Sequence, residues 1–282
     1  MKMKIKENIW LWGQDAGSHH CAGPQKENIW NLPGVNKMGP VEGAEFFGID
    51  NICRVVMSGK PEPPFASEMD KLKNVGNVIW SVLGDGGSDR AGENADDLAA
   101  FLEIAGKYPN LRGGVLDDFF RPLSKLVDGG ELARVTIDRL REIRDKLHAV
   151  SIPQELWMVV YEHFLSEKYA PYMALSDAVS FWTWRGRESL PNLEDNLKKI
   201  FELSPQQKHL GGLYLYDYGH CMEMDMELLK KQCKLYTEYL KNGNLQGVII
   251  CSNCIADLGL PAIDYIRDWV AEIGDEEVEL KN

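Results

Sequence analysis

The sequence has few features of a membrane or secreted protein. No uninterrupted apolar run approaches the ~20 residues that a bilayer-spanning helix needs. Residues 1–8 carry lysines but lead directly into 9–13, without the longer apolar stretch and small-residue cleavage site of a signal peptide. We therefore expect a soluble, cytoplasmic protein that has no membrane partner.

Cysteine and positive charge are also scarce. The six cysteines among 282 residues are not arranged as a disulfide framework, which suits a reducing compartment. There are 31 basic and 43 acidic residues, for a net charge of -12, which repels phosphate backbones and anionic lipids. We expect no nucleic-acid partner, and instead a small-molecule or oligosaccharide substrate; the oligomeric state stays open.

Phosphate-binding and metal-binding motifs are missing as well. No G-x-G-x-x-G or P-loop follows an apolar run, which weighs against a doubly wound open sheet. His163 and His220 could join Asp or Glu side chains in a mixed site, but no H-E-x-x-H spacing is present. Cys251 and Cys254 form an isolated C-x-x-C, which is more typical of core or rim thiols. The sequence therefore predicts neither a metal nor a cofactor.

What the sequence does contain is a regular alternation of short apolar runs and longer stretches of helical periodicity. Such alternation is typical of βαβ units and a parallel sheet. The runs recur roughly every 35 residues, close to the spacing in a (β/α)₈ barrel of ~250 residues. We predict one (β/α)₈ barrel domain spanning 1–282. The expected strands are 9–12, 51–56, 78–83, 114–117, 156–161, 178–182, 213–216 and 247–251.

The expected helices differ in strength. Two crossovers have weak helical patterns: the first has only 40–47, and the fifth has only the stretch around 168–175, which Pro171 interrupts. Either helix is expected to be short. The clearest helical segments are 96–108, 131–150, 193–203, 224–241 and 261–273.

Reactive and hydrogen-bonding side chains follow almost every expected strand. The βα loops of a barrel converge at the carboxyl ends of the strands, so this is where we expect the functional site. Aromatic residues gather there too and could stack on sugar rings, although such residues are more often core. The residues predicted to bind substrate are Trp12, Gln14, Asp15, Arg54, Asp85, Asp117, His163, Trp182, Trp184, Arg185, Tyr216 and Asn253.

The adjacent acids Asp117 and Asp118 are the sharpest feature. Neighbouring strand residues face opposite ways, so one acid should enter the site while the other binds backbone; we favour Asp118 as the inward one. Each acid at a strand end has a structural alternative as a helix N-cap. For Glu162 and His163, that alternative is a salt-bridged pair at the rim.

Acids on the fourth, fifth and seventh expected strands give the chain a positional likeness to barrel glycoside hydrolases, and it resembles the alpha-amylase-like clan. The resemblance implies that Asp118 is the nucleophile, Glu162 the acid/base and Asp217 the third, substrate-distorting carboxylate. The chain has Leu116 and Tyr216 where that clan has an arginine and a histidine. The implied activity is hydrolysis of a glycosidic bond by paired carboxyl groups with separated pKa values.

Two other functions fit the same barrel. One is a metal-dependent lyase, aldolase or isomerase that uses His163 and His220 with acidic ligands. The other is a barrel that binds carbohydrate without catalysis. Stoichiometric metal would favour the first, and glycan binding without turnover would favour the second.

Overall fold

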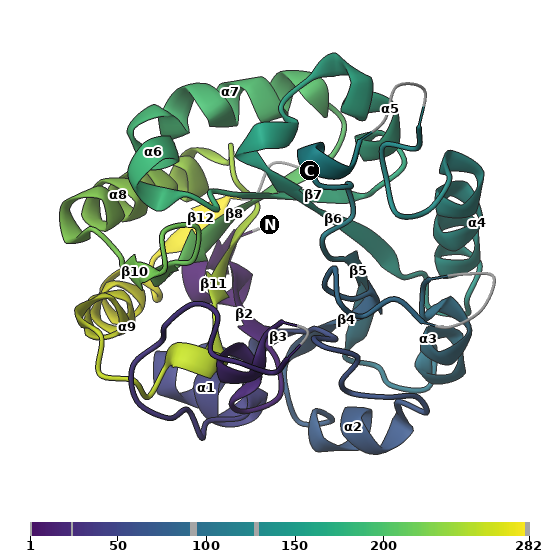
Figure 1. Ribbon diagram of the computed structural model, residues 1–282, viewed down its shortest axis with the longest axis horizontal. Coiled ribbons are helices and arrows are strands. Elements are labelled where there is room, and N and C mark those ends of the chain that lie inside the picture. Colours follow the sequence, from purple (N-terminus) through teal and green to yellow (C-terminus); the bar gives the residue numbers. More distant parts are fainter. Residues whose placement is uncertain (1, 24, 91–94, 127–129, 280–282) are drawn as a thin grey trace.

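The fold is a closed barrel of parallel strands surrounded by helices. The structure is a computed structural model that describes residues 2–23, 25–90, 95–126 and 130–279. Eight strands close in the order β11-β2-β3-β4-β5-β6-β7-β8, which confirms the predicted (β/α)₈ barrel (Figure 1). The barrel strands are β2 (Ile9–Gly13), β3 (Asn51–Arg54), β4 (Asn77–Leu83), β5 (Leu111–Leu116), β6 (Glu155–Tyr161), β7 (Ala178–Trp182), β8 (Lys208–Tyr214) and β11 (Gly247–Cys251).

Each of the clearest predicted helical segments contains a helix, but two helices are shorter than predicted. α3 covers 98–104 of the predicted 96–108, and α4 begins at Ile137 rather than at 131. Buried Leu193, Leu197, Ile200 and Leu203 lie on one face of α7, which has the predicted bounds. The α-helices are α1 (Pro40–Phe47), α2 (Ala66–Lys71), α3 (Leu98–Ile104), α4 (Ile137–His148), α5 (Ala170–Met173), α6 (Gly186–Ser189), α7 (Leu193–Leu203), α8 (Met226–Asn242) and α9 (Pro261–Ile273).

Short 3₁₀ helices occupy several of the connections. In the fifth crossover, α5 has only four residues, and Pro171 lies in its first turn, where a proline needs no donor. The six-residue α2 in the second crossover was not predicted. The 3₁₀ helices are η1 (Ile5–Asn8), η2 (Ser18–Cys21), η3 (Leu123–Lys125), η4 (Glu162–Phe164), η5 (Glu167–Tyr169), η6 (Leu190–Asn192) and η7 (Asn253–Ile255).

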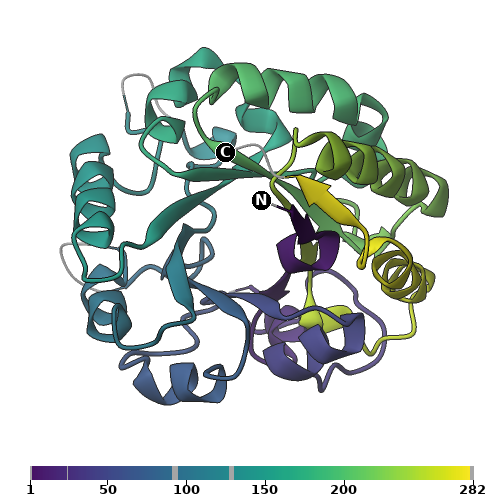
Figure 2. The ribbon, with the colours of Figure 1, turned by 180° about the vertical axis from the view of Figure 1, so that it is seen from behind.

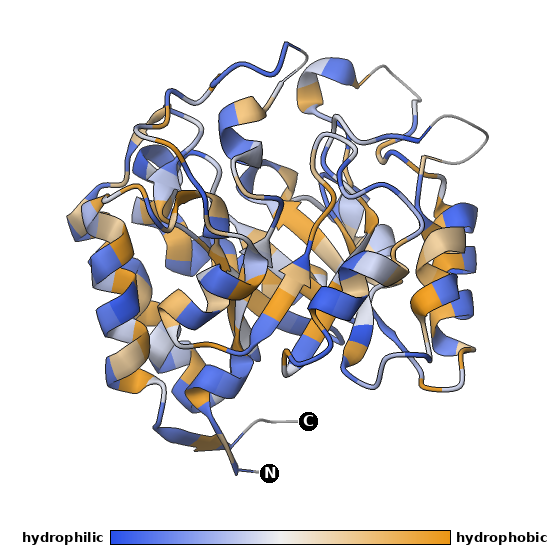
Figure 3. Cartoon of the chain, turned by 90° about the horizontal axis from the view of Figure 1, so that it is seen from below, coloured by the Kyte–Doolittle hydropathy of each residue, from blue (hydrophilic) through white to orange (hydrophobic). Residues whose placement is uncertain are grey.

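The two ends of the barrel differ. At one end, β1 (Lys2–Lys4) pairs antiparallel with β12 (Glu277–Glu279), and Figure 2 shows these terminal strands side by side. Figure 3 shows both termini at that end and long loops at the opposite end. The hairpin of β9 (Tyr216–Asp217) and β10 (Met222–Glu223) follows β8. The loops at the carboxyl ends of the strands are therefore free to form a site.

Aromatic rings fill much of the barrel interior. Trp10 contacts Trp157 edge to face with centroids 4.9 Å apart, and Trp12 contacts Trp182 at 5.3 Å. A Cβ on Gly212 of β8 would lie 2.1 Å from the Trp182 ring, so only glycine leaves room for this tryptophan. This packing supports the floor of the cavity described below.

None of the helices described has both the length and the apolar character required to cross a membrane.

Candidate functional site

A cavity of about 340 Å³ opens at the carboxyl ends of the strands. One part of its wall is aromatic and another is acidic, and positively charged side chains also reach it. The aromatic residues that line it are Trp12, Trp30, Phe120, Tyr161, Phe164, Trp182, Trp184, Tyr214 and Tyr218. The polar and charged ones include Gln14, His19, Asp85, Asp89, Asp117, Asp118, Arg121, Lys125, Arg134 and His163.

Asp117 and Asp118 both line this cavity. Strand β5 ends at Leu116, and Asp118 has a φ of 41°, in the left-handed region that non-glycine residues rarely adopt. Because the backbone has left the extended conformation, the strand rule that neighbouring side chains face opposite ways no longer holds. The expectation that Asp118 reaches the site agrees with this placement. Asp117, expected to bind backbone and also predicted among the substrate-binding residues, lines the cavity while its carboxylate accepts the backbone N–H of Asp118.

The carboxylate of Asp118 is held by the loop after β4 and by the end of β6. Its Oδ2 accepts a hydrogen bond of 2.9 Å from the backbone N–H of Gly86, and its Oδ1 accepts one of 2.9 Å from the Tyr161 hydroxyl. Strained backbone conformations concentrate at functional sites, where surrounding contacts hold them in place. The position of Asp118 fits that description.

Asp117 is 6% exposed, and its Oδ1 accepts a hydrogen bond of 2.9 Å from the Asp118 N–H. Burial raises the pKa of the Asp117 carboxyl well above its usual value, and the negative charges of Asp118 and Asp85 raise this pKa further. The positive charge of Arg134 opposes the shift only in part. The site therefore contains one carboxyl group that favours its protonated form.

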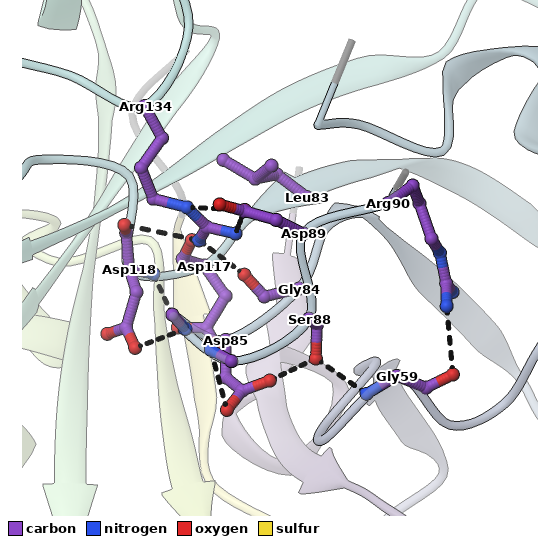
Figure 4. Close-up of polar contacts among 12 residues, drawn as sticks. Gly59, Leu83, Gly84, Asp85, Ser88, Asp89, Arg90, Asp117, Asp118 and Arg134 are labelled. Carbon is purple, nitrogen blue, oxygen red and sulfur yellow. Dashed lines mark hydrogen bonds and ion pairs between the residues drawn. The ribbon is translucent and has the colours of Figure 1, made fainter. Parts of the chain in front are cut away.

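Arg134 fixes the backbone under these acids (Figure 4). Its guanidinium donates to the carbonyl oxygens of Gly84 at 2.6 Å, Asp117 at 3.0 Å and Asp118 at 3.3 Å. It also forms an ion pair with Asp89, and its own side chain is 6% exposed. Arg134 thus ties the end of β4 to the end of β5.

Asp85, another predicted residue, lines the cavity, but its oxygens are already bound by groups in the loops after β3 and β4. The carboxylate accepts hydrogen bonds from the N–H groups of Ser58 at 2.9 Å and Gly87 at 3.3 Å, and from the Ser88 hydroxyl (Figure 4). His163 also lines the cavity, and burial lowers the pKa of its imidazole.

Glu162 is not among the lining residues. Its Oε2 accepts from the N–H of Trp184 at 3.0 Å, and its Oε1 accepts from the N–H of Arg185 and the Ser189 hydroxyl, each at 3.2 Å. These contacts match the cap-like alternative, since they satisfy free N–H groups just before α6. His163 Nδ1 lies 4.0 Å from Glu162 Oε2, beyond hydrogen-bond distance, and the lowered pKa of His163 disfavours the positive charge that the expected salt bridge requires.

Asp217 is likewise outside the cavity, with a fully buried side chain. Its Oδ2 accepts from the N–H of Arg187 at 3.1 Å, and its carboxylate pairs with His220 Nδ1 at 2.9 Å. Hydrogen bonds to Asp217 and Glu188 raise the pKa of His220. The structure therefore does not bring Asp118, Glu162 and Asp217 together in one cavity, because two of them hold the segment around α6.

The other predicted residues divide in the same way. Trp12, Gln14, Trp182 and Trp184 line the cavity. Five do not. Arg54 is buried against Asp15 and Glu68, while Arg185 pairs with Glu188 at 3.2 Å. The Tyr216 hydroxyl donates to the carbonyl of Trp30 at 2.8 Å, and the Asn253 amide bonds the backbone of Gln14 and Met38.

Several residues that line this cavity were not predicted from the sequence, among them Tyr161, Arg134 and Trp30. Tyr161 is the last residue of β6, and this place at a strand end could have identified it. Arg134 and Trp30 lie in long connections, where nothing in the surrounding sequence marks them.

The described part of the chain contains no group of three or more His, Cys, Asp or Glu side chains arranged to hold a metal ion. Cys251 and Cys254 are both buried free thiols.

The fold resembles several solved structures. A proposed alpha-L-fucosidase from Bacteroides thetaiotaomicron matches with a TM-score of 0.55 and 10% identity, over 82% of this chain and 84% of that one. An FMN-binding beta-glucuronidase from Faecalibacterium prausnitzii matches with a TM-score of 0.50 and 9% identity, over 88% of this chain and 40% of that one. The likeness shows the fold. The predicted resemblance to barrel glycoside hydrolases is confirmed at that level.

The sequence matches no protein-family model, and no curated protein is significantly similar to it.

Proposed function

We propose that the chain is a carbohydrate-active barrel enzyme that hydrolyses a glycosidic bond. The observation that carries this proposal is the placement of Asp117 and Asp118 in one cavity whose wall is rich in aromatic rings. Flat apolar rings suit the faces of sugars, and carboxyl groups supply the acid and the negative charge that glycoside hydrolysis requires. A cavity of about 340 Å³ is within the range of small-molecule sites.

In this proposal the two acids have different roles. Asp117 is the proton donor to the leaving oxygen, because its burial and acidic neighbours favour the protonated form. Asp118 is the carboxylate that faces the anomeric carbon, where positive charge develops in the transition state. The Gly86 N–H and the Tyr161 hydroxyl hold it in position.

This assignment keeps Asp118 as the central carboxylate and moves the proton donor from Glu162 to Asp117. The hydrogen bonds that Glu162 accepts from Trp184, Arg185 and Ser189 support the change, since they leave that carboxylate occupied beside α6.

The test is a screen of p-nitrophenyl glycosides and oligosaccharides against wild type, Asp118→Asn and the surface control Asp264→Asn. The panel should include α-L-fucosides and β-D-glucuronides, which the names of the structural neighbours suggest. We expect turnover by wild type and Asp264→Asn and a loss of roughly 10²–10⁴-fold in Asp118→Asn. Equal turnover by Asp118→Asn would remove this residue from the mechanism. Sugar binding without turnover by wild type would indicate a non-catalytic barrel.

A further inference from the structure

A buried hydrogen-bonded chain, Gln14–His19–Tyr218, also lines the cavity. Gln14 directly follows β2 and is 3% exposed, as is His19. Gln14 Oε1 bonds His19 Nε2, and His19 Nδ1 lies 2.8 Å from the Tyr218 hydroxyl. Each ring nitrogen of His19 therefore has one partner.

These partners determine where the protons lie. An amide oxygen can only accept, so His19 Nε2 must carry the hydrogen that it donates to Gln14. In a neutral imidazole the other nitrogen then accepts, so the Tyr218 hydroxyl donates to Nδ1. Burial lowers the pKa of His19 to about 3, which keeps the ring neutral over the working pH range.

The backbone of Gln14 is fixed just as firmly. Its N–H donates to Asn253 Oδ1 at 2.8 Å, and its carbonyl accepts from Asn253 Nδ2 at 2.9 Å. Because the side-chain oxygen is turned toward His19, the amide NH₂ is the end left for the cavity. Among the described residues, no protein acceptor is bonded to that NH₂.

We propose that the Gln14 amide is a hydrogen-bond donor subsite for an uncharged oxygen of the substrate, a hydroxyl or a carbonyl, and that His19 is the positioning residue that orients it. The proposal deepens the proposed function, on which it rests. A donor at this point favours an oxygen acceptor and disfavours a protonated amine, because an ammonium group offers no lone pair. The subsite therefore discriminates among sugars that differ at a single substituent.

The experiment measures kcat/KM for Gln14→Met, with the p-nitrophenyl glycoside that wild type hydrolyses fastest and with its monodeoxy analogues. Loss of one neutral hydrogen bond should lower kcat/KM about 2- to 12-fold for the parent glycoside. For one deoxy analogue, the variant and wild type should have equal kcat/KM, because that substrate lacks the oxygen that accepts the hydrogen bond from Gln14. The matched control is Gln207→Met, because Gln207 lies just before β8 and does not line the cavity. This control should not change kcat/KM for the parent glycoside or for its deoxy analogues. A uniform loss across all analogues, or no loss, would overturn the proposal.

The orienting role of His19 is tested by Tyr218→Phe and His19→Phe. His19→Phe removes the residue that bonds the Gln14 amide, and Tyr218→Phe removes the hydroxyl that bonds His19. Each variant should therefore lose the preference for the same sugar substituent that Gln14→Met loses. The double variant Gln14→Met with Tyr218→Phe should be no worse than Gln14→Met alone. Additive losses would contradict the proposal that His19 and Tyr218 act through Gln14.

If wild type hydrolyses no glycoside, the proposed function fails. In that case, the affinity of wild type and Gln14→Met for the corresponding methyl glycosides, measured by tryptophan fluorescence, tests the Gln14 subsite separately. Equal affinity in the two proteins, or no binding by either, would reject the subsite.

Discussion

Tyr161 at the end of β6 donates a hydrogen bond of 2.9 Å to Oδ1 of Asp118, just beyond the end of β5. Burial and the charge of Asp118 raise the pKa of Tyr161 well above its usual value, so the hydroxyl keeps the proton that it donates. This contact joins two strand ends at the group that the proposed chemistry depends on.

Tyr161→Phe should therefore lower kcat/KM by about 10- to 100-fold, because a hydrogen bond to a charged group contributes roughly 1.5–3 kcal/mol. The control is Tyr169→Phe, which removes a buried hydroxyl that has no partner in the described structure. Steady-state kinetics should show no loss for this control. Equal losses in both variants would mean that Tyr161 acts only through packing.

Asp117→Asn should remove the proton donor. The rate should fall strongly for substrates with poor leaving groups and little for 2,4-dinitrophenyl glycosides, which need no protonation. The wild-type rate should also fall as pH rises through the raised pKa of Asp117, and the variant should lack this alkaline limb. Kinetics across leaving groups and pH measure both effects.

Glu162→Gln is the comparison for that experiment, because it alters a strand-end carboxylate that does not line the cavity. It should keep both the alkaline limb and the dependence on leaving group. If Glu162→Gln instead shows the pattern expected of Asp117→Asn, the proton donor is Glu162.

Arg134→Lys should reduce turnover although it keeps the charge. Arg134 bonds the carbonyls of Gly84, Asp117 and Asp118 through Nη1 and the carboxylate of Asp89 through Nε and Nη2, and one ammonium group cannot reach both sides at once. The matched variant is Arg90→Lys. Arg90 bonds the carbonyls of Gly59 and Pro61 and the carboxylate of Asp97, but neither Asp117 nor Asp118; Figure 4 shows its bond to Gly59. Both should unfold at lower denaturant concentration, but only Arg134→Lys should lose kcat by tenfold or more. Similar kcat values would show that Arg134 only stabilises the fold.

His19 should make the protein less stable in acid. Its pKa is lowered to about 3 in the folded state, from an ordinary value near 6.5. The unfolded chain binds the proton more readily, so stability is present above about pH 6.5 and is lost as pH falls toward 3. The loss from this residue is about 2 kcal/mol between pH 7 and pH 5. Urea unfolding of wild type and His19→Gln at both pH values should show a smaller pH effect in the variant; equal effects would argue against a buried neutral imidazole.

The fold was predictable because apolar periodicity reports on burial, and burial determines strands and helices. The exact bounds of α7 follow from its evenly spaced leucines and isoleucine. The short α2 was missed because its six residues are mostly polar and bury only Met69. The pairing of β1 with β12 joins the two ends of the chain, and no local pattern reports such a contact.

The site was only partly predictable, because position after a strand does not determine what a side chain binds. Glu162 and Asp217 were predicted correctly as strand-end acids, yet backbone N–H groups near α6 occupy both. The left-handed backbone at Asp118, which brings both neighbouring acids to the cavity, depends on contacts from Gly86 and Tyr161 that are distant in sequence.

The most direct measurement is a crystal structure of Asp118→Asn with its glycoside substrate bound. We predict a sugar ring inside the cavity, with the glycosidic oxygen about 2.6–3.2 Å from an Asp117 carboxyl oxygen. A substrate bound outside the cavity, or one whose glycosidic oxygen lies beside Glu162, would contradict it.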